Sequence, residues 1–213
     1  MKLVATADTH YPFDASMIPD GDVFILAGDF MYRGTPDEWE PRLASLAALP
    51  HKHKIFVPGN HDYFPTHYRG LARSELRRQA KTTLHDDLNP CFEIDDVKFL
   101  AIPFVSGLPG WAYNQDEAWI YKWLKAATVG YDPDVIISHS PPLYIGDAAK
   151  LNNYGCMAFN KWFYEEGHKP SIWISGHVHE SYGHRRVNNT AFYNVAMCDS
   201  DYNQSNKPMV IEV

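Results

Sequence analysis

A series of short motifs in the chain combines side chains that bind metal ions well. These motifs are Asp8-x-His10, Gly28-Asp29, Gly59-Asn60-His61-Asp62, His139 and Gly176-His177-x-His179. Imidazole nitrogens, carboxylates and an amide oxygen form a mixed set of donors that suits Mn, Fe, Zn or Co. Calcium sites use oxygen throughout, and structural zinc sites use thiolates. Ligands two residues apart lie on one face of an extended backbone, so each D-x-H or H-x-H pair can reach one site.

Nearly all of these motifs follow a predicted strand directly. Short apolar, β-branched runs at residues 3–6, 23–27, 55–57, 97–102, 135–137 and 172–174 predict buried strands. Because the carboxyl ends of strands gather at one edge of an open α/β sheet and form its ligand site, we expect the motifs to converge. The glycines at 28, 59 and 176 are expected to permit tight turns beside the metals.

Helices are expected between the strands, at residues 37–49, 74–81, 116–127 and 157–166. This alternation predicts an α/β fold in which a sheet-based sandwich is covered by helices. Residues 182–213 are predicted to add further strands joined by Asn-rich turns. Residues 103–114 are rich in Gly, Pro and aromatic residues and predict a long loop of the kind that often carries function.

The composition predicts one soluble globular domain spanning residues 1–213. Hydrophobic residues make up 45% of the chain and charged residues 21%, a balance typical of a chain that buries its own core. The net charge is -7, and the basic residues between Arg69 and Arg78 suit the solvated face of a helix. Extended nucleic acid is therefore not the expected partner. A small phosphate-bearing substrate is compatible, because bound cations would cancel part of the negative charge.

The cysteines and the amino terminus bear on the compartment. Cys91, Cys156 and Cys198 are widely spaced, which predicts neither a disulfide framework nor a thiolate zinc site and favours a reducing compartment. The amino terminus becomes polar too early for a signal peptide, and no apolar run approaches the roughly 20 residues that span a bilayer. We expect a cytoplasmic protein with no membrane contact.

Each motif alone also has an ordinary structural explanation. Asp8 and His10 fit a surface loop, Asn60 fits a turn, His139 fits a hydrogen-bonded structural histidine, and residues 176–179 fit an exposed turn. The ordered series, each member at a strand end, favours the metal site. The remaining histidines lack that placement and are expected at the surface; they are His51, His53, His67, His85, His168 and His184.

Taken in order, the motifs resemble those of the calcineurin-like metallophosphoesterase superfamily from Asp8 to His179. The segments 107–114, 138–142, 154–156 and 176–183 further resemble the small branch of metallophosphoesterase-domain-containing proteins, whose members are phosphodiesterases acting on cyclic nucleotides. This resemblance implies a two-sheet β-sandwich flanked by helices.

The resemblance also implies the arrangement of ligands. Asp8, His10, Asp29 and His179 would hold a first ion, and Asn60, His139 and His177 a second, with Asp29 bridging the two. Because these ligands supply nitrogen and oxygen but no thiolate, we expect two divalent transition-metal ions, with Mn first and Fe, Zn, Ni, Co or Mg as alternatives. Two ions about 3.5–4 Å apart can share a bridging hydroxide and hold phosphoryl oxygens for in-line attack.

Further residues are expected to act around this centre. His61 is assigned as a proton donor or charge stabiliser, with hydrogen bonding to a ligand as the alternative. Asp62 is expected to orient a ligand or His61. Arg33 would contact a phosphate oxygen or else lie free at the surface. Tyr63, Trp111 and Tyr113 would stack on a base, with burial in the core as the alternative.

Three functions are therefore considered. The first is a phosphodiesterase acting on cyclic nucleotides or small phosphodiesters. The second is a DNA or RNA nuclease of the same superfamily, against which the short length and acidic charge count. The third is a non-catalytic metal-bound scaffold for partner proteins, which retention of every ligand and of His61 disfavours. A homo-oligomer remains open.

Overall fold

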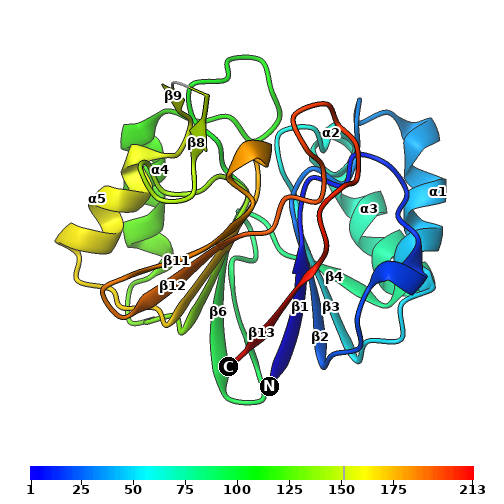
Figure 1. Cartoon of the computed structure of the whole chain (residues 1–213), viewed down its shortest axis with the longest axis horizontal. Helices are drawn as coiled ribbons and strands as arrows, with labels where there is room; N and C mark the ends of the chain where they lie inside the picture. The colour runs from blue at the N-terminus through cyan, green and yellow to red at the C-terminus, as the bar shows by residue number, and fades with distance from the viewer. Residues whose placement is uncertain (151) are drawn as a thin grey trace.

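Two β-sheets pack face to face in the computed structural model, and helices cover both outer faces (Figure 1). The structure describes residues 1–150 and 152–213. The predicted two-sheet α/β sandwich flanked by helices is confirmed.

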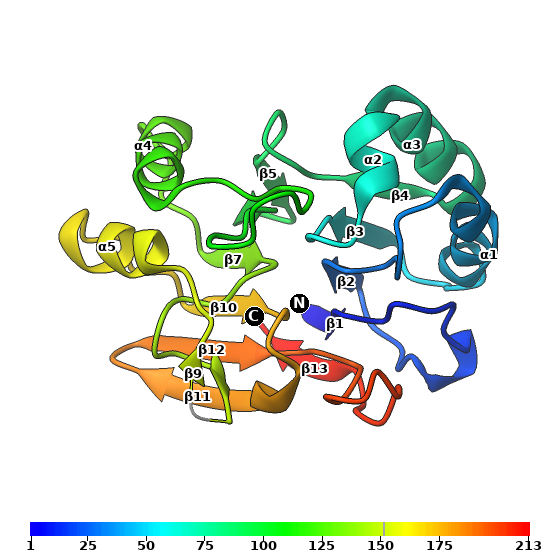
Figure 2. The same cartoon turned by 90° about the horizontal axis from the view of Figure 1, so that it is seen from above.

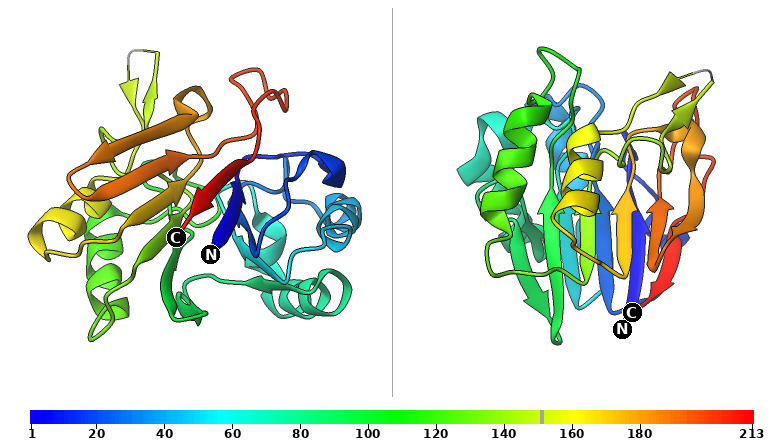
Figure 3. Two further views of the ribbon diagram at one scale, coloured as in Figure 1. Left: turned by 60° about the horizontal axis from the view of Figure 1, so that its bottom comes forward. Right: turned by 90° about the vertical axis from the view of Figure 1, so that its left-hand side faces the viewer.

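The first sheet has the strand order β13-β1-β2-β3-β4. Its strands are β1 (Lys2–Thr6), β2 (Val23–Ala27), β3 (His53–Val57), β4 (Thr82–Leu84) and β13 (Met209–Glu212). Strands β1 to β4 are parallel, and β13 pairs antiparallel with β1 at the edge. The two ends of the chain therefore lie side by side (Figure 3), where the Met1 ammonium donates to the carbonyl oxygen of Val213 at 2.6 Å.

The second sheet has the order β11-β12-β10-β7-β6-β5. Its strands are β5 (Cys91–Ile94), β6 (Val97–Ile102), β7 (Val135–Ser138), β10 (Ile172–Ser175), β11 (Gly183–Val187) and β12 (Thr190–Asn194). The four central strands are parallel, and β5 and β11 pair antiparallel at the edges. A small separate pair, β8 (Ala148–Ala149) and β9 (Asn152–Asn153), lies beyond this sheet.

Helices pack on the outer face of each sheet through apolar side chains at helical spacing. The first sheet is covered by α1 (Pro36–Ala47), α2 (Tyr63–His67), α3 (Arg69–Glu75) and the π-helical turn η2 (Leu76–Ala80), and the second by α4 (Glu117–Ala127) and α5 (Met157–Glu165) (Figure 2). In α1, Pro36 occupies the first turn, where its missing N–H has no cost, and the acidic side chains that follow complement the helix dipole. Trp39, Leu43 and Leu46 of this helix are buried against the sheet.

The unbroken apolar runs arise because the central strands are buried on both faces. In β2, Phe24 and Leu26 pack toward the helices, whereas Val23, Ile25 and Ala27 pack in the core between the sheets. The same alternation holds in β7, where Ile136 faces α4 and α5. A strand that is buried on both faces has no side exposed to water, so successive residues are apolar.

Several elements differ from the prediction. The helix predicted at 74–81 begins earlier, at Arg69, and ends in η2. Helix α2 and strands β4, β5, β8 and β9 were not predicted. Residues 103–114 form the expected irregular loop, which is closed by a bridge between Val105 and Asn114. Two short 3-10 turns, η1 (Ala15–Met17) and η3 (His179–Ser181), complete the described elements. Within the described ranges, no helix has the length and apolar character needed to cross a membrane.

Candidate metal centre

The loops that follow β1, β2, β3, β7 and β10 meet at one edge of the sandwich and bring the predicted ligands together. In Figure 1, β1 runs upward from the N-terminus, so this edge lies at the top. Potential ligand atoms lie within 4.8 Å of one another in three groups: Asp8, His10 and His179; His10, Asp29 and His61; and Asp29, His139 and His177. His10 and Asp29 each belong to two groups, so the ligand atoms form one continuous cluster.

The backbone at this edge adopts conformations that aim the side chains inward. Asp8, His10, Asp29 and His177 have φ values of 49°, 50°, 52° and 68°, in the left-handed region that non-glycine residues rarely adopt. Each such residue costs on the order of 1–3 kcal/mol and persists only when its surroundings enforce it. Here the amide of Asp8 donates to the carbonyl of Gly28 at 2.9 Å, and the amide of His10 to that of Asp29 at 3.1 Å.

Three glycines allow the ligand loops to approach one another closely. A Cβ at Gly28 would collide with the ring of His139, one at Gly59 with the carboxylate of Asp29, and one at Gly176 with the carboxylate of Asp8. The expectation that these glycines stand beside the centre is met. At Gly28, with a φ of 95°, both the backbone geometry and the lack of space require glycine, whereas at Gly59 and Gly176 the requirement is for space.

Four of the histidines are oriented in the same way by the main chain. The Nδ1 atoms of His10, His61, His139 and His179 lie 3.2, 2.6, 3.1 and 2.8 Å from the carbonyl oxygens of Met31, Tyr32, Ala27 and Asp199. Because a carbonyl oxygen can only accept, each Nδ1 carries the hydrogen and Nε2 remains free to face the centre. This is the orientation that main-chain partners give to metal-ligating imidazoles.

The atoms at the centre are placed to bind a cation. The Nε2 atoms of His10 and His179 face each other at 3.3 Å, and together with Asp8 they form a group that could hold one ion. The Oδ1 atom of Asp8 is buried without a hydrogen-bond partner among the described residues. Across the cluster, His139 Nε2 lies 3.3 Å from Asp29 Oδ1 and 3.0 Å from Asn60 Oδ1. The donors are nitrogen and oxygen, so the residues present fit divalent transition-metal ions.

The electrostatics of the cluster keep its carboxylates ionised. Burial would lower the pKa of His139, but the carboxylate of Asp29 outweighs it and raises that pKa to about 9. His179 shows the same balance with Asp8, and its pKa is also raised to about 9. Burial would raise the pKa of Asp29, yet the neighbouring His139 and His61 hold it well below its ordinary value. The pKa of His10 is lowered to about 4, chiefly by burial. These pKa shifts favour an anionic carboxylate at Asp29 and a neutral imidazole at His10, while a bound cation would take the place of the protons on His139 and His179.

His61 belongs to the middle group of the cluster, with His10 and Asp29, and has one nitrogen available for proton transfer. Its main-chain amide donates to Asp29 Oδ1 at 2.8 Å, while its Nε2 atom lies 3.9 Å from Asp29 Oδ2. With Nδ1 bound to the carbonyl of Tyr32, only Nε2 can exchange a proton with a substrate.

Asp62 acts on the main chain rather than on His61. Its carboxylate is buried and accepts from the amides of Gly59 at 2.7 Å, Met31 at 3.0 Å and Phe30 at 3.4 Å. Burial, with the nearby charge of Asp29, raises its pKa to about 7. Asp62 thus ties the loops after β2 and β3 together, which agrees with the ligand-orienting alternative.

The four candidate substrate-binding residues differ in their exposure. Trp111 is 41% exposed, and its ring lies 4.6 Å from that of His61. Tyr63 donates to the carbonyl of Gly110 at 3.0 Å and lies 6.3 Å from Trp111. Arg33 is exposed, and its main-chain amide is held by Glu38. Tyr113 is only 8% exposed and packs in the core beneath the loop, so its ring has no free face for a base.

Three contributors to the centre were missed in the sequence. Arg42 of α1 is buried and donates to the carbonyls of His10 and Phe30. Asp199 supplies the carbonyl that orients His179. The ring of Tyr202 lies 4.8 Å from that of His10 and 5.1 Å from that of His179. A single arginine in a helix gives no signal, and neither does an aromatic residue in a polar tail.

The prediction that the remaining histidines lie at the surface is wrong for two of them. His51 is buried near Phe24, and its Nε2 lies 3.0 Å from the carbonyl of Pro19. His85 is buried with its ring 3.7 Å from that of Phe92. Both lie outside the ligand cluster, where apolar neighbours made burial favourable without a metal.

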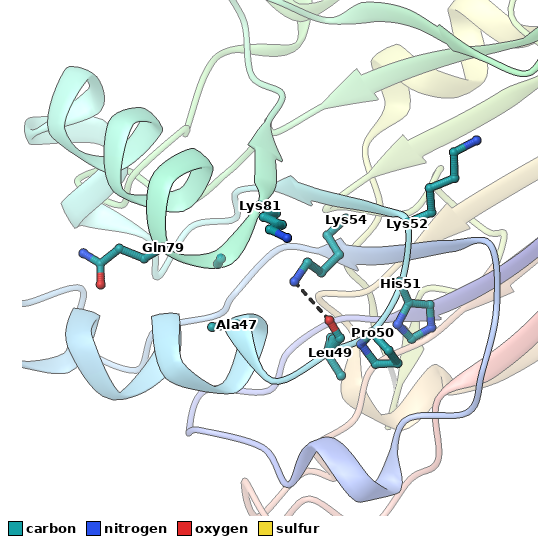
Figure 4. A pocket seen from close by; sticks show the side chains of 9 residues that line it. Ala47, Leu49, Pro50, His51, Lys52, Lys54, Gln79 and Lys81 are labelled. Carbon is teal, nitrogen blue, oxygen red and sulfur yellow. Dashed lines mark hydrogen bonds between the residues drawn. The ribbon is translucent and has the colours of Figure 1, made fainter.

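A cavity of about 330 Å³ lies at the opposite end of the first sheet, where β3 and β4 begin (Figure 4). Lys54 lines it and donates to the carbonyls of Leu46 at 2.8 Å and Leu49 at 3.2 Å, at the end of α1. None of the ligand candidates lines this cavity, so it is separate from the metal centre.

Fold and site together give a two-sheet sandwich with a cluster of candidate metal ligands at the strand ends. The family model for calcineurin-like phosphoesterases matches residues 1–181, and the chain belongs to that family. The chain is similar to human metallophosphoesterase domain-containing protein 1, at 28% identity over all of this chain and 71% of that protein. It is also similar to a UPF0046 protein of Caenorhabditis elegans, at 31% identity over all of this chain and 75% of the other. The phosphopantetheinyl hydrolase of Mycobacterium tuberculosis shares the fold, with a TM-score of 0.68, 16% identity, and coverage of 94% of this chain and 90% of the other.

The family supports a metal-dependent hydrolase of phosphoesters, and the ligand clusters are where such an activity would lie.

Proposed function

We propose that the protein is a dinuclear metal-dependent phosphodiesterase that hydrolyses cyclic nucleotides or other small phosphodiesters. The observation that carries this proposal is the continuous cluster of buried and half-buried ligand candidates in which His10 and Asp29 are shared between groups. A shared carboxylate is what two neighbouring cations require, and two-metal sites of this kind serve in-line displacement at phosphorus.

The proposed ligands divide between two ions. Asp8, His10, Asp29 and His179 would hold the first, and Asn60, His139 and His177 would hold the second, with Asp29 available to both. Mn is the best match to the mixed donors. When bound, the ions neutralise charge on the phosphoryl oxygens and supply an activated water.

The remaining residues act on the substrate or, in the case of Asp62, support the ligand loops. His61 delivers a proton through Nε2 to the oxygen that leaves phosphorus, because its Nδ1 is committed to Tyr32. The exposed face of Trp111, with Tyr63 beside it, accepts a base by stacking. Arg33 reaches a phosphate oxygen from the turn after β2. Asp62 preserves the geometry of the ligand loops through its contacts with Gly59 and Met31.

The charge of the chain and the lining of the site favour a small diester. A net charge of -7 gives no electrostatic footprint for a long polyanion. The aromatic side chains beside His61 suit an organic group such as a base. The free thiols of Cys91, Cys156 and Cys198 agree with a cytoplasmic location.

A substrate panel tests the proposal. The protein, loaded in turn with Mn, Mg, Ni and Zn, is assayed with 2′,3′- and 3′,5′-cyclic nucleotides, an aryl phosphodiester, an aryl phosphomonoester and a single-stranded oligonucleotide. We expect turnover of the diesters, greatest with Mn, and two metal ions per chain by elemental analysis. Asp29→Asn is expected to abolish turnover and His168→Ala to preserve it. Exclusive cleavage of the oligonucleotide, or no turnover of any ester, would overturn the proposal.

A further inference from the structure

The segment 199–206, here called the C-terminal loop, is fastened to the metal centre although it lies beyond the residues that the family model matches. The carbonyl of Asp199 accepts from His179 Nδ1 at 2.8 Å. The side chain of Gln204 donates to the carbonyls of Thr9 at 2.8 Å and Tyr11 at 3.2 Å. These contacts hold the loop against the residues around His10. Figure 1 shows it in red beside the end of β1.

The C-terminal loop also has an internal frame that fixes Tyr202. The carboxylate of Asp199 accepts from the amides of Asp201 at 2.9 Å and Asn203 at 3.0 Å. The amide of Tyr202 donates to the carbonyl of Asp199 at 3.0 Å, and Tyr202 itself has a φ of 63°. A tyrosine in the left-handed region costs about 1–3 kcal/mol. The hydrogen bonds within the loop offset this cost and fix the position of the Tyr202 side chain.

The ring of Tyr202 faces the ligands and the proposed proton donor. Its centroid lies 4.8 Å from that of His10, 5.1 Å from His179 and 6.4 Å from His61, and it meets the ring of Tyr32 at 90° and 5.6 Å. The side chain remains 37% exposed. Tyr202 therefore covers the first ligand group on one side and presents free aromatic surface on the other.

Trp111 approaches His61 from a different part of the fold. Seen from above, the loop of residues 103–114 lies near β5 and β7, whereas the C-terminal loop lies beyond β13 and β1 (Figure 2). His61 is thus in contact with Trp111 at 4.6 Å and near Tyr202 at 6.4 Å. The centre has aromatic surface from two separate segments of the chain.

We infer that Tyr202 is a specificity-determining residue, and that its ring forms the wall of the substrate site on the side of Asp8, His10 and His179. This inference rests on the proposed function and names its substrate class: phosphodiesters whose organic group is a planar ring such as a base. An aromatic wall stabilises any base by stacking and gives an aliphatic group much less. The ring carries the effect, and the hydroxyl is dispensable.

The test compares Tyr202→Ala and Tyr202→Phe with Tyr164→Ala, a control at an exposed tyrosine on α5. For a 2′,3′-cyclic nucleotide we expect Tyr202→Ala to raise KM about tenfold with kcat little changed, as stacking predicts. For a glycerophosphodiester, which has no ring, KM should stay within about twofold of the wild type. Tyr202→Phe should match the wild type on both substrates.

Binding to the metal-loaded protein gives a second readout that does not depend on turnover. By calorimetry, Tyr202→Ala should weaken a nucleoside monophosphate about tenfold and leave inorganic phosphate unchanged, with two metal ions still bound. The proposed role of the Tyr202 ring would be wrong if both ligands bound equally more weakly, or if metal were lost. It would also be wrong if Tyr202→Phe were as impaired as Tyr202→Ala. If the wild type hydrolyses no diester, the proposed function fails, whereas the nucleotide-binding comparison still decides the role of Tyr202.

Discussion

Each orienting contact at the metal centre fixes a single atom. Because His10, His61, His139 and His179 give Nδ1–H to a main-chain carbonyl, their Nε2 atoms are presented to the centre before any ion or substrate arrives. Such contacts commonly change metal affinity or activity 10–100-fold when they are lost. His61 is oriented in the same way as the ligand histidines and differs from them in its position. It follows Asn60 in the chain, and its ring lies beside that of Trp111.

Replacement of His61 separates proton transfer from metal binding. We expect His61→Ala to retain two metal ions and to slow hydrolysis of a 2′,3′-cyclic nucleotide by roughly 10²–10⁴-fold, the usual contribution of general acid catalysis. An aryl diester should lose less, because its leaving group needs little protonation. The measurement is kcat for both substrates together with metal content. Equal losses on both substrates would indicate charge stabilisation instead, and loss of metal would make His61 a ligand.

The buried His85 predicts a pH dependence of stability that is independent of the centre. Burial lowers its pKa from the ordinary value of 6.5, so below pH 6.5 the unfolded chain binds a proton that the folded chain does not. Stability therefore falls as the pH decreases from 6.5. We expect His85→Gln to make the free energy of unfolding less dependent on pH between 6.5 and 5, by up to about 1.4 kcal/mol per pH unit. Urea unfolding at several pH values measures this slope. The exposed His184 provides the control, and a slope unchanged in His85→Gln would contradict the prediction.

At the scale of elements, the strands that precede ligands could be predicted and the edges could not. The run at 23–27 coincides with β2, and the run at 135–137 forms the first three residues of β7, because strands that are buried on both faces consist of consecutive apolar residues. Strand β4 has only three residues, and β5 is a half-exposed edge strand, so neither leaves such a run.

The sequence predicted which ligand types gather at the strand ends, but it could not predict contacts made across the whole chain. Tyr202 meets His10 because residues 195–198 pair with Ala7 and Asp8, and because Gln204 donates to the carbonyls of Thr9 and Tyr11. The left-handed backbone of Asp29 and His177 also has no signature in residue type, since glycine is the usual residue there. Tertiary contacts enforce it.

Because the ligand loops approach one another closely, adding one methyl group at Gly176 should disturb the metal centre. A Cβ at Gly176 would strike the carboxylate of Asp8, so Gly176→Ala should displace that ligand, lower the metal content and reduce activity by at least about tenfold. Gly70→Ala is the matched control, because Gly70 lies within α3 with open space around it and helix propensity favours alanine. Metal analysis and activity of the two variants provide the comparison. Full metal content in Gly176→Ala would contradict the prediction and would show that the loop after β10 shifts to accommodate the methyl group.

At the scale of the whole molecule, the centre lies across the two sheets. Asp8, His10, Asp29 and Asn60 follow strands of the first sheet, whereas His139, His177 and His179 follow strands of the second. Apart from this edge, the sheets are held together by apolar side chains such as Leu3 and Ile174. Bound ions would therefore connect the two halves of the sandwich.

Removal of the metal ions should lower the thermal stability of the whole fold. Each ion that binds only the folded chain, at about 100 times its Kd, adds about 2.7 kcal/mol, so two ions add about 5.4 kcal/mol. For a chain of this size each kcal/mol corresponds to about 2–4 °C in Tm. We expect chelation to lower Tm by roughly 10–20 °C in one cooperative transition, measured by calorimetry at a fixed scan rate. Asp29→Asn should show a low Tm with or without chelator, because the shared carboxylate is needed at both positions, and His168→Ala should respond like the wild type. An unchanged Tm after complete removal of metal would mean that the apolar interface alone holds the sheets, and that the ligand loops keep their left-handed backbone without the ions.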